Sequence, residues 1–289
     1  MCSTCLMSDM IPIYVVISTI DDGLQRVPAV LGSAAQQDVR YVVSWQRTQT
    51  ALAEAAASAL AELRLRSDVT VTELEGRGLC RNRNHGIETA VSLMSDPLAD
   101  AIIVVADDDE TFQPDAFDRM RRSYSLLPRL DIALLRASGS EDGRPLKPYL
   151  PYPVAYGEHP RSYYPMSVEM TMRSRVWHAG LRFDERFGLG SDVLCSGEED
   201  VFLHDALRRG LNVWLLPIEL CRTRPLTTGS RQLDPAVLRS KGAVYGYTRN
   251  LCMAWLRGLR EALSLGVRCR TNPFTLFRHI VRGINYIRR

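Results

Sequence analysis

Apolar runs alternate with helix-forming stretches along the N-terminal half of the chain. The apolar or β-branched runs predict strands at residues 11–19, 41–45, 69–74, 101–106 and 131–136. The stretches between them predict helices at residues 27–35, 48–66, 82–94 and 115–127. Strands that alternate with helices form βαβ units, so we expect an α/β fold with a mostly parallel central sheet flanked by helices.

This alternation stops after Ala137. Residues 138–165 contain six prolines and five tyrosines. A loop of this length in a compact domain is usually functional, and its aromatic content favours an ordered binding surface. The remaining pattern predicts a strand at 168–176, a turn-rich stretch at 180–187, a helix from Gly197 to Arg209, and a last strand at 212–216 that Pro217 ends.

The composition predicts a folded intracellular protein. The chain has 289 residues, of which 46% are hydrophobic, enough for a large α/β domain with an appendage. No apolar run approaches the roughly 18–20 residues that span a bilayer, and residues 1–10 lack the features of a signal peptide. Seven dispersed cysteines indicate reduced thiols, and the lone pair Cys2 and Cys5 lacks the second pair of a zinc site.

The central apolar run, Ala101–Ala106, ends in Asp107-Asp108-Asp109-Glu110. Consecutive carboxylates at the end of a buried strand repel one another and lose hydration. A divalent cation such as Mg²⁺ or Mn²⁺, which prefers oxygen ligands, would compensate them. The alternative is an acidic loop that caps the next helix, with Pro114 as its first residue.

Two further charged clusters have the spacing of a binding site. Arg77, Arg81 and Arg83 lie near a predicted helix start, where arginines and backbone N–H groups bind phosphate oxygens; the alternative is a solvated basic turn. The cluster Glu198-Glu199-Asp200 can supply a general base. It can also serve only as a helix cap, because Ser196 and Glu199 have capping-box spacing.

Taken in order, these segments resemble the motifs of glycosyltransferase family 2, whose members have the GT-A fold. The matching segments are Ile17-Ser18-Thr19, Gly78-Leu79-Cys80-Arg81-Asn82-Arg83-Asn84, Asp107-Asp108-Asp109, Phe183-Asp184-Glu185-Arg186-Phe187-Gly188 and Gly197-Glu198-Glu199. Cys80 stands where the family's Gly-Leu-Ser-x-x-Arg-Asn motif has serine. The resemblance covers residues 11–230.

The resemblance implies transfer of a sugar from a nucleotide-diphosphate donor to an acceptor hydroxyl, with inversion. It implies that Asp107 and Asp109 hold Mn²⁺ or Mg²⁺, which would neutralise the departing diphosphate. The expected catalytic residues are Glu198, Glu199 and Asp200. Counting back from Phe202 favours Glu199 as the base, whereas the Glu-Asp pair favours Asp200. The expected donor-binding residues are Ser18, Thr19, Arg81, Arg83, Asn84, Asp107, Asp108 and Arg224.

Arg224 marks a departure from the family. Many relatives carry a histidine metal ligand before the turn that here reads Pro225-Leu226-Thr227-Thr228-Gly229. An arginine cannot ligate a metal, but it can bind a diphosphate with two hydrogen bonds. Two alternatives therefore stay open: a nucleotidyltransferase on a related fold, and an inactive protein that binds sugars or nucleotides.

The C-terminal segment differs in charge from the rest of the chain. Residues 241–289 contain ten Lys and Arg against one acidic residue, a net charge of +9, whereas the whole chain carries +3. Asn272 and Pro273 predict a helix start. Apolar residues then recur on one helical face, flanked by arginines, which is typical of an interfacial helix: Phe277, Ile280, Val281, Ile284 and Ile287. The alternative is that this face packs on the domain.

The expected organisation is therefore a flexible N-terminus (1–10), a GT-A domain (11–230) and a basic helical tail (231–289). The expected partners are a nucleotide sugar, a saccharide or lipid-linked saccharide acceptor, and an anionic membrane surface, with no nucleic acid. The expected location is the cytoplasm, peripheral on the inner membrane face, in polysaccharide or glycolipid assembly.

Overall fold

The computed structural model describes residues 10–32, 36, 38–94, 96, 99–160, 162–224 and 231–289. Its contacts define two compact units. The first comprises the described residues of Met1–Gly76, Asn82–Leu181 and Ala206–Pro225, and the second those of Arg77–Arg81, Arg182–Asp205 and Leu226–Arg289. Cys2, Cys5, most of the N-terminal segment and the turn after Arg224 lie outside the described residues. The division at residues 10 and 230 stays a prediction.

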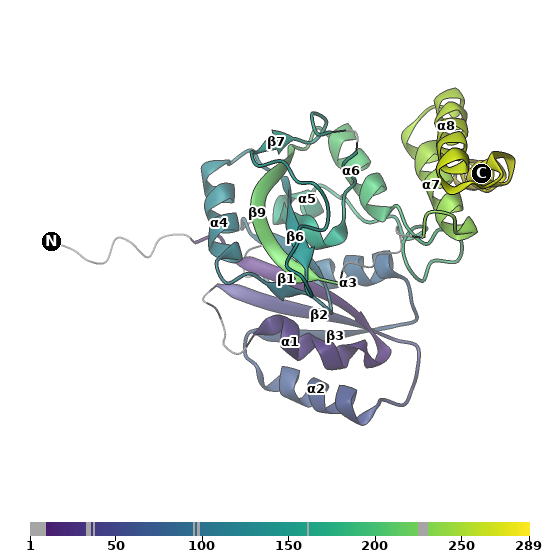
Figure 1. The fold of residues 1–289 in the computed structure, drawn as a ribbon. Helices are drawn as coiled ribbons and strands as arrows, with labels where there is room; N and C mark the ends of the chain where they lie inside the picture. The colour runs from purple at the N-terminus through teal and green to yellow at the C-terminus, as the bar shows by residue number, and fades with distance from the viewer. Residues whose placement is uncertain are drawn as a thin grey trace. The chain divides into compact units, whose positions relative to one another are not determined.

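The first unit is built on a mixed sheet in the order β3-β2-β1-β4-β8-β6-β9-β5, with β7 paired to β9. Strands β1, β2, β3 and β4 are parallel to one another, whereas β8 is antiparallel to both β4 and β6. The α/β class is confirmed, and the sheet is mixed where a mostly parallel one was expected (Figure 1). The strands are β1 (Ile13–Ile20), β2 (Val39–Arg47), β3 (Val69–Glu75), β4 (Ile102–Asp107), β5 (Thr111–Phe112), β6 (Ile132–Gly139), β7 (Val154–Ala155), β8 (Met170–Arg173) and β9 (Val213–Thr223).

Helices cover both faces of the sheet. The odd-numbered residues of β1 share a core with the 3₁₀ turn η1 (Asp21–Arg26) and with α1 (Val27–Leu31), α2 (Glu54–Leu65) and α4 (Ala116–Leu126). On the other face, α3 (Leu79–Ser92) approaches Val16 so closely that a Cβ on Gly86 would lie 2.5 Å from Val16 Cγ1. That glycine lets the helix lie directly on the strand.

Two predicted strands have different bounds. The strand predicted at 168–176 is only β8, since Ser174 begins the short helix α5 (Ser174–His178) and the 3₁₀ turn η2 (Ser167–Glu169) precedes it. The prediction that Pro217 ends the last strand is wrong, because β9 continues to Thr223. Its pairing with β6 shifts from Leu134–Leu215 to Arg136–Glu219, so Pro217 lies in a bulge. A bulge tolerates proline because its N–H is not needed in the ladder.

The proline- and tyrosine-rich loop is anchored by a buried ion pair. Lys147 Nζ lies 2.9 and 2.8 Å from the two carboxylate oxygens of the fully buried Glu169. The hydroxyls of Tyr149 and Tyr163 donate to the same carboxylate at 2.6 and 2.8 Å. Burial raises the pKa of Glu169 above its ordinary value even with this ammonium beside it.

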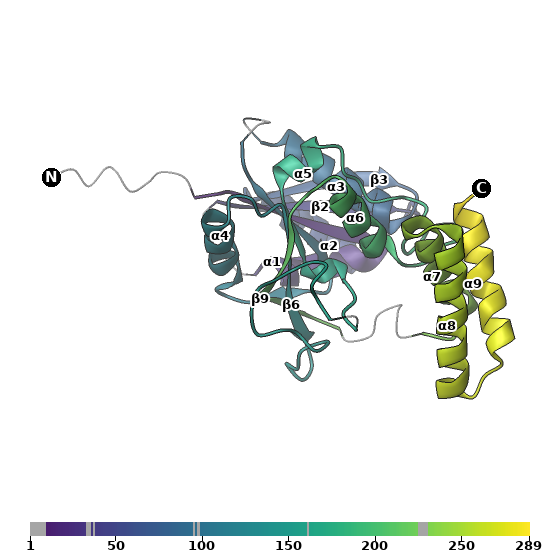
Figure 2. The same cartoon turned by 90° about the horizontal axis from the view of Figure 1, so that it is seen from above.

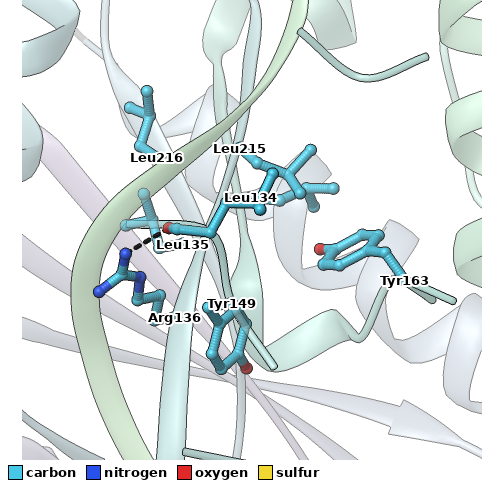
Figure 3. Close-up of a pocket in the computed structure, with 8 residues that line it drawn as sticks. Leu134, Leu135, Arg136, Tyr149, Tyr163, Leu215 and Leu216 are labelled. Carbon is cyan, nitrogen blue, oxygen red and sulfur yellow. Dashed lines mark hydrogen bonds between the residues drawn. The ribbon is translucent and has the colours of Figure 1, made fainter. Parts of the chain in front are cut away.

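These tyrosines form a packed structure, and the hollow beside them is small. A cavity of about 10 Å³ is lined by Leu134, Leu215, Tyr149 and Tyr163, among others, and Figure 3 shows these side chains. That volume holds roughly one water molecule. The loop's β7 pairs with Trp214 and Leu215 at the start of β9, about 25 Å along the strand from its end at Thr223. Only β7 lies at that start, because Tyr149 Oη accepts from Ala137 N at 3.1 Å and Ala137 pairs with Cys221 near the end of β9.

The second unit contains a bundle of three helices, α7 (Pro235–Thr248), α8 (Leu251–Cys269) and α9 (Pro273–Ile287), which lie side by side in both views (Figures 1 and 2). Asn272 caps α9 by accepting from Phe274 N at 2.9 Å, as predicted. Glycines bring α7 and α9 together: a Cβ on Gly242 would lie 1.9 Å from Ile280 O, and one on Gly283 would lie 1.8 Å from Arg239 O.

The apolar face of α9 is consequently not an interfacial face. Ile280 and Ile284 are fully buried in a core with Leu238 of α7 and with Ala254 and Leu265 of α8. The prediction that this face lies on a membrane is wrong. The periodicity of apolar residues predicts which face of a helix is buried, but it does not predict what covers that face. None of the helices in the described part of the chain is both long and apolar enough to cross a bilayer.

We expect Lys147→Met to lower the free energy of unfolding by about 3–5 kcal/mol, because it leaves the carboxylate of Glu169 buried without its cation. Urea unfolding followed by circular dichroism measures this loss. The matched control is Arg64→Met, whose ion pair with Glu73 is exposed and should contribute less than about 1 kcal/mol. Equal losses in the two variants would contradict this account of the loop.

Candidate donor and metal site

The candidate site of the first unit lies where β1 and β4 end. These parallel neighbours place Ser18 opposite Asp107, so Ser18 and Thr19 flank the acidic run that follows β4. Both side chains are buried, and in the described part of the chain Ser18 Oγ has no hydrogen-bond partner. Ligands of open α/β sheets bind at such carboxyl ends of strands, and a buried orphan hydroxyl there is suited to a polar ligand.

Asp108 organises the loop after β1. Thr19 Oγ1 donates to Asp108 Oδ2 at 2.5 Å, and Arg26 of η1 donates to Asp108 Oδ1 through Nη2 at 2.7 Å and Nε at 3.1 Å. Gly23 makes this packing possible, since a Cβ there would lie 2.6 Å from Asp108 Oδ2. Both carboxylate oxygens of Asp108 thus bind protein groups, so its contribution is to hold Thr19 and Arg26 in place.

Asp107 is paired with a buried arginine of α3. Arg83 is 1% exposed, and its Nη2 donates to Asp107 Oδ1 at 3.1 Å. The neighbouring Asn82 fixes the helix at the sheet edge: its Nδ2 donates to Thr19 O at 3.0 Å, and its Oδ1 accepts from Ser44 Oγ at 2.6 Å. The helix therefore delivers a rigid guanidinium to the end of β4.

Asp109 faces the end of β9. Its Oδ1 accepts from Thr223 Oγ1 at 3.3 Å, and its Oδ2 lies 3.9 Å from Arg224 Nε. Burial and the carboxylates of Asp107 and Asp108 raise the pKa of Asp109 above its ordinary value. The negative potential around Asp109 is therefore only partly balanced, which is the environment that attracts a cation.

Glu110 completes the acidic run inside the protein. Its Oε1 accepts from Asp107 N at 2.7 Å, and its side chain is fully buried. Burial, with Asp107 beside it, raises the pKa of Glu110 well above its ordinary value. Glu110 therefore shapes the turn and does not offer a ligand.

The residues present fit a divalent cation of the Mg²⁺ kind. In the described ranges no three His, Cys, Asp or Glu side chains are grouped as a protein cage for a metal. Mg²⁺ needs no such cage, because it is commonly bound by one or two carboxylates together with substrate phosphates and waters. Asp107 and Asp109, whose side chains are 32% and 27% exposed, are the two carboxylates available for that role.

The second unit contains the other acidic cluster, at the start of α6 (Glu198–Arg208). Glu198 is buried, Glu199 is half-buried and Asp200 is exposed. Gly197 has φ +97°, which sets the sharp entry into the helix. Residues 77–81, with Arg81, belong to this unit too: Leu79 N donates to Leu189 O at 2.8 Å, and a Cβ on Gly188 would lie 3.1 Å from Cys80 Sγ.

The predicted residues thus divide between the units. Ser18, Thr19, Arg83, Asp107, Asp108, Asp109 and Arg224 gather in the first unit, where Asn84 is half-buried on α3. Arg81 and Glu198, Glu199 and Asp200 belong to the second unit. Arg26 and Thr223 were not predicted from the sequence, and Asn82 and Glu110 were named only as members of the segments 78–84 and 107–110. The contacts of Asn82 with Thr19 and Ser44 join distant parts of the chain, so no local pattern predicts them.

Comparisons with known proteins identify the fold. No protein-family model and no curated protein matches the chain. Among solved structures, S. aureus TarS 1–349 matches with a TM-score of 0.57 at 12% identity, over 95% of this chain and 89% of that one. A longer TarS structure matches with a TM-score of 0.59 at 12% identity over 93% of this chain, which spans only 55% of that structure.

The chain has a GT-A-like fold. The resemblance stated from the sequence is confirmed at this level, because the match covers nearly the whole chain. TarS 1–349 has also been solved in complex with UDP and with UDP-GlcNAc, and these structures match with TM-scores of 0.54 and 0.55 at 15% and 13% identity. They cover 91% and 88% of this chain and 74% and 71% of theirs.

Proposed function

We propose that the protein transfers a sugar from a nucleotide-diphosphate donor to an acceptor hydroxyl, with inversion at the transferred carbon. The observation that carries the proposal is the end of β4. Three successive carboxylates there each meet a separate arginine, next to the buried Ser18 and Thr19. On a GT-A-like fold, this arrangement suits a ligand that combines hydroxyls with a charged diphosphate.

The residues of the first unit have binding and positioning roles in this proposal. Ser18 and Thr19 present hydroxyls to the nucleoside part of the donor, while Asp108 and Arg26 hold Thr19 in position. Arg83 and Arg224 offer guanidinium groups to phosphate oxygens. Arg81 and Asn84, which the resemblance also assigns to the donor, keep that assignment as part of the proposal.

Asp107 and Asp109 would hold Mg²⁺ or Mn²⁺. When bound, such a cation supplies charge neutralisation to the leaving diphosphate. Arg83 and Arg224 would also help to neutralise the diphosphate, because Arg224 lies beside Asp109 and Arg83 beside Asp107. UDP-GlcNAc is the first donor to test, since the similar TarS structure was solved in complex with it.

For the base, we propose Glu199 or Asp200. An acceptor hydroxyl is a weak nucleophile until a carboxylate takes its proton. Both side chains are at least partly open to solvent, whereas Glu198 is buried close to Gly188 and suits a structural role better. The acceptor class, a saccharide or lipid-linked saccharide in polysaccharide or glycolipid assembly, belongs to the same proposal.

One observation favours a second candidate function, an inactive nucleotide-sugar-binding protein. Arg224 stands where many members of the resembling family have a metal-ligating histidine. Such a protein would bind UDP-GlcNAc and release no UDP. Binding followed by thermal shift, and UDP release followed by a coupled assay, therefore separate the two functions.

Metal dependence is the first expected outcome. We expect UDP release to require Mn²⁺ or Mg²⁺ and to fall by at least about a hundredfold in Asp109→Asn, because the diphosphate would lose its neutralising cation. Asp115→Asn, an exposed control at the start of α4, should retain full activity. Full activity in excess chelator would refute a metal-dependent mechanism.

Loss of the base should lower turnover and leave donor binding intact. We expect Glu199→Gln or Asp200→Asn to lower kcat by roughly 10²–10⁴-fold, with an unchanged thermal shift on UDP-GlcNAc. Glu54→Gln, at the equivalent first turn of α2, is the control. If neither variant loses more than a few-fold, the cluster serves only as a helix cap.

Arg224 should act on the donor. We expect Arg224→Ala to raise the donor KM by about 10- to 100-fold, because a charge-assisted contact to a phosphate oxygen is worth about 1.5–3 kcal/mol. Arg222→Ala, two residues earlier on the exposed side of β9, is the matched control. Unchanged donor KM in Arg224→Ala would remove this residue from the site.

A further inference from the structure

Helix α8 has a second apolar face, which the bundle does not bury. Large apolar side chains stand exposed at 255, 256, 259, 263 and 267, the i, i+1, i+4, i+8 and i+12 positions of one helical face. We call them the α8 stripe: Trp255 (41% exposed), Leu256 (60%), Leu259 (41%), Leu263 (50%) and Val267 (83%).

The buried core of the bundle does not include the α8 stripe, although Trp255 contacts Phe277 of α9. The small residues Ala254, Gly258 and Ala262, with Leu265, form the opposite face of α8 and are fully buried. Ala254, Ala262 and Leu265 share a core with Ile280 and Ile284 of α9. Five large apolar side chains on one exposed helical face are unfavourable in water and uncommon on a free surface, so they indicate an interaction site.

Arginines border this stripe on both sides. Arg260, one turn after Leu256 and one before Leu263, is exposed on α8. On α9, the exposed Phe274 lies one turn before Arg278, while Phe277 packs edge-on against Trp255 with ring centroids 5.9 Å apart. The one acidic residue of 241–289, Glu261, is already paired with Lys241 at 2.9 Å. The result is an apolar strip with arginines on both sides. No unpaired acidic side chain of residues 241–289 weakens their positive charge.

We propose that the α8 stripe binds the surface of an anionic lipid bilayer. The leucines and Trp255 would enter the boundary between headgroups and acyl chains while Arg260, Arg278 and Arg282 contact lipid phosphates. The charge selects this occupant over a second copy of the chain, because two copies would bring two segments of net charge +9 together. The helix lies along the surface and does not cross it. This inference is independent of the proposed sugar transfer.

Vesicle co-sedimentation of the full chain tests the proposal. We expect binding to vesicles that contain phosphatidylglycerol, little binding to phosphatidylcholine alone, and release by added salt. Trp255 provides a second signal. Trp45 and Trp177 are buried, at 0% and 2% exposed, and Trp214 is partly buried against the core of the first unit, so a blue shift of tryptophan emission that comes from the α8 stripe should vanish in Trp255→Phe.

Substitutions on exposed positions keep the fold intact. Leu256→Ser with Leu263→Ser should weaken binding to anionic vesicles roughly tenfold or more. Arg260→Gln and Arg278→Gln should each weaken it roughly fivefold. The matched control is Leu65→Ser with Leu126→Ser, which removes two leucines that are 87% and 73% exposed on α2 and α4; it should bind as the unchanged chain does.

Three results would overturn the proposal. Equal binding to neutral and anionic vesicles would remove the role of the arginines. Equal losses in the α8 and control variants would remove the role of the α8 stripe. An oligomer in light scattering that Leu256→Ser with Leu263→Ser converts to monomer, without any vesicle binding, would assign the stripe to a second copy.

Discussion

The compensation of three successive carboxylates at the end of a fully buried strand is the constraint that organises the first unit. Asp107 ends β4, Asp108 and Asp109 follow it, and each is matched to a different arginine: Arg83 from α3, Arg26 from η1 and Arg224 after β9. Three elements distant in the sequence therefore have to meet at one sheet edge. Glycines stand at positions 23 and 86, where a Cβ would keep η1 away from Asp108 and α3 away from the sheet.

The elements that local pattern encodes were predictable, and so was the acidic end of the central strand. β4 is apolar on both faces, and Asn272 with Pro273 marks the start of α9. The short strands β5 and β7 were not predicted, because each is two residues long and depends on a partner far along the chain. β8 was predicted as part of a longer strand, but not its antiparallel direction, which its pairing with β4 and β6 sets. Pro217 misled for the same reason: its bulge is a property of the pairing between β6 and β9.

The charged residues of the candidate site were found from the sequence, but several of their partners were not. A run of aspartates is visible in the sequence, whereas the contacts of Arg26 and Thr223 join residues that are far apart in the chain and meet only in the fold. The tyrosine-rich loop shows the converse. Its composition favoured a binding surface, yet Tyr149 and Tyr163 are used to satisfy the buried Glu169. In the bundle, Gly242, Gly246 and Gly283 were the available signal that α9 faces another helix.

Arg224 changes what a metal can contribute at this site. A histidine in its place would add a third ligand, whereas a guanidinium 3.9 Å from Asp109 is itself a cation that stabilises the carboxylate. Arg224 and a divalent ion would therefore share the negative charge of Asp109 and of a departing diphosphate. Arg224 carries its charge permanently, whereas a metal ion has to bind first. Its side chain is 68% exposed, so its attraction to Asp109 is screened by water and salt. Arg224 could therefore turn from Asp109 toward a phosphate. On the proposed function, the chain would combine two carboxylates suited to Mg²⁺ with a cation of its own, so that Arg224 would neutralise part of the diphosphate charge without a metal.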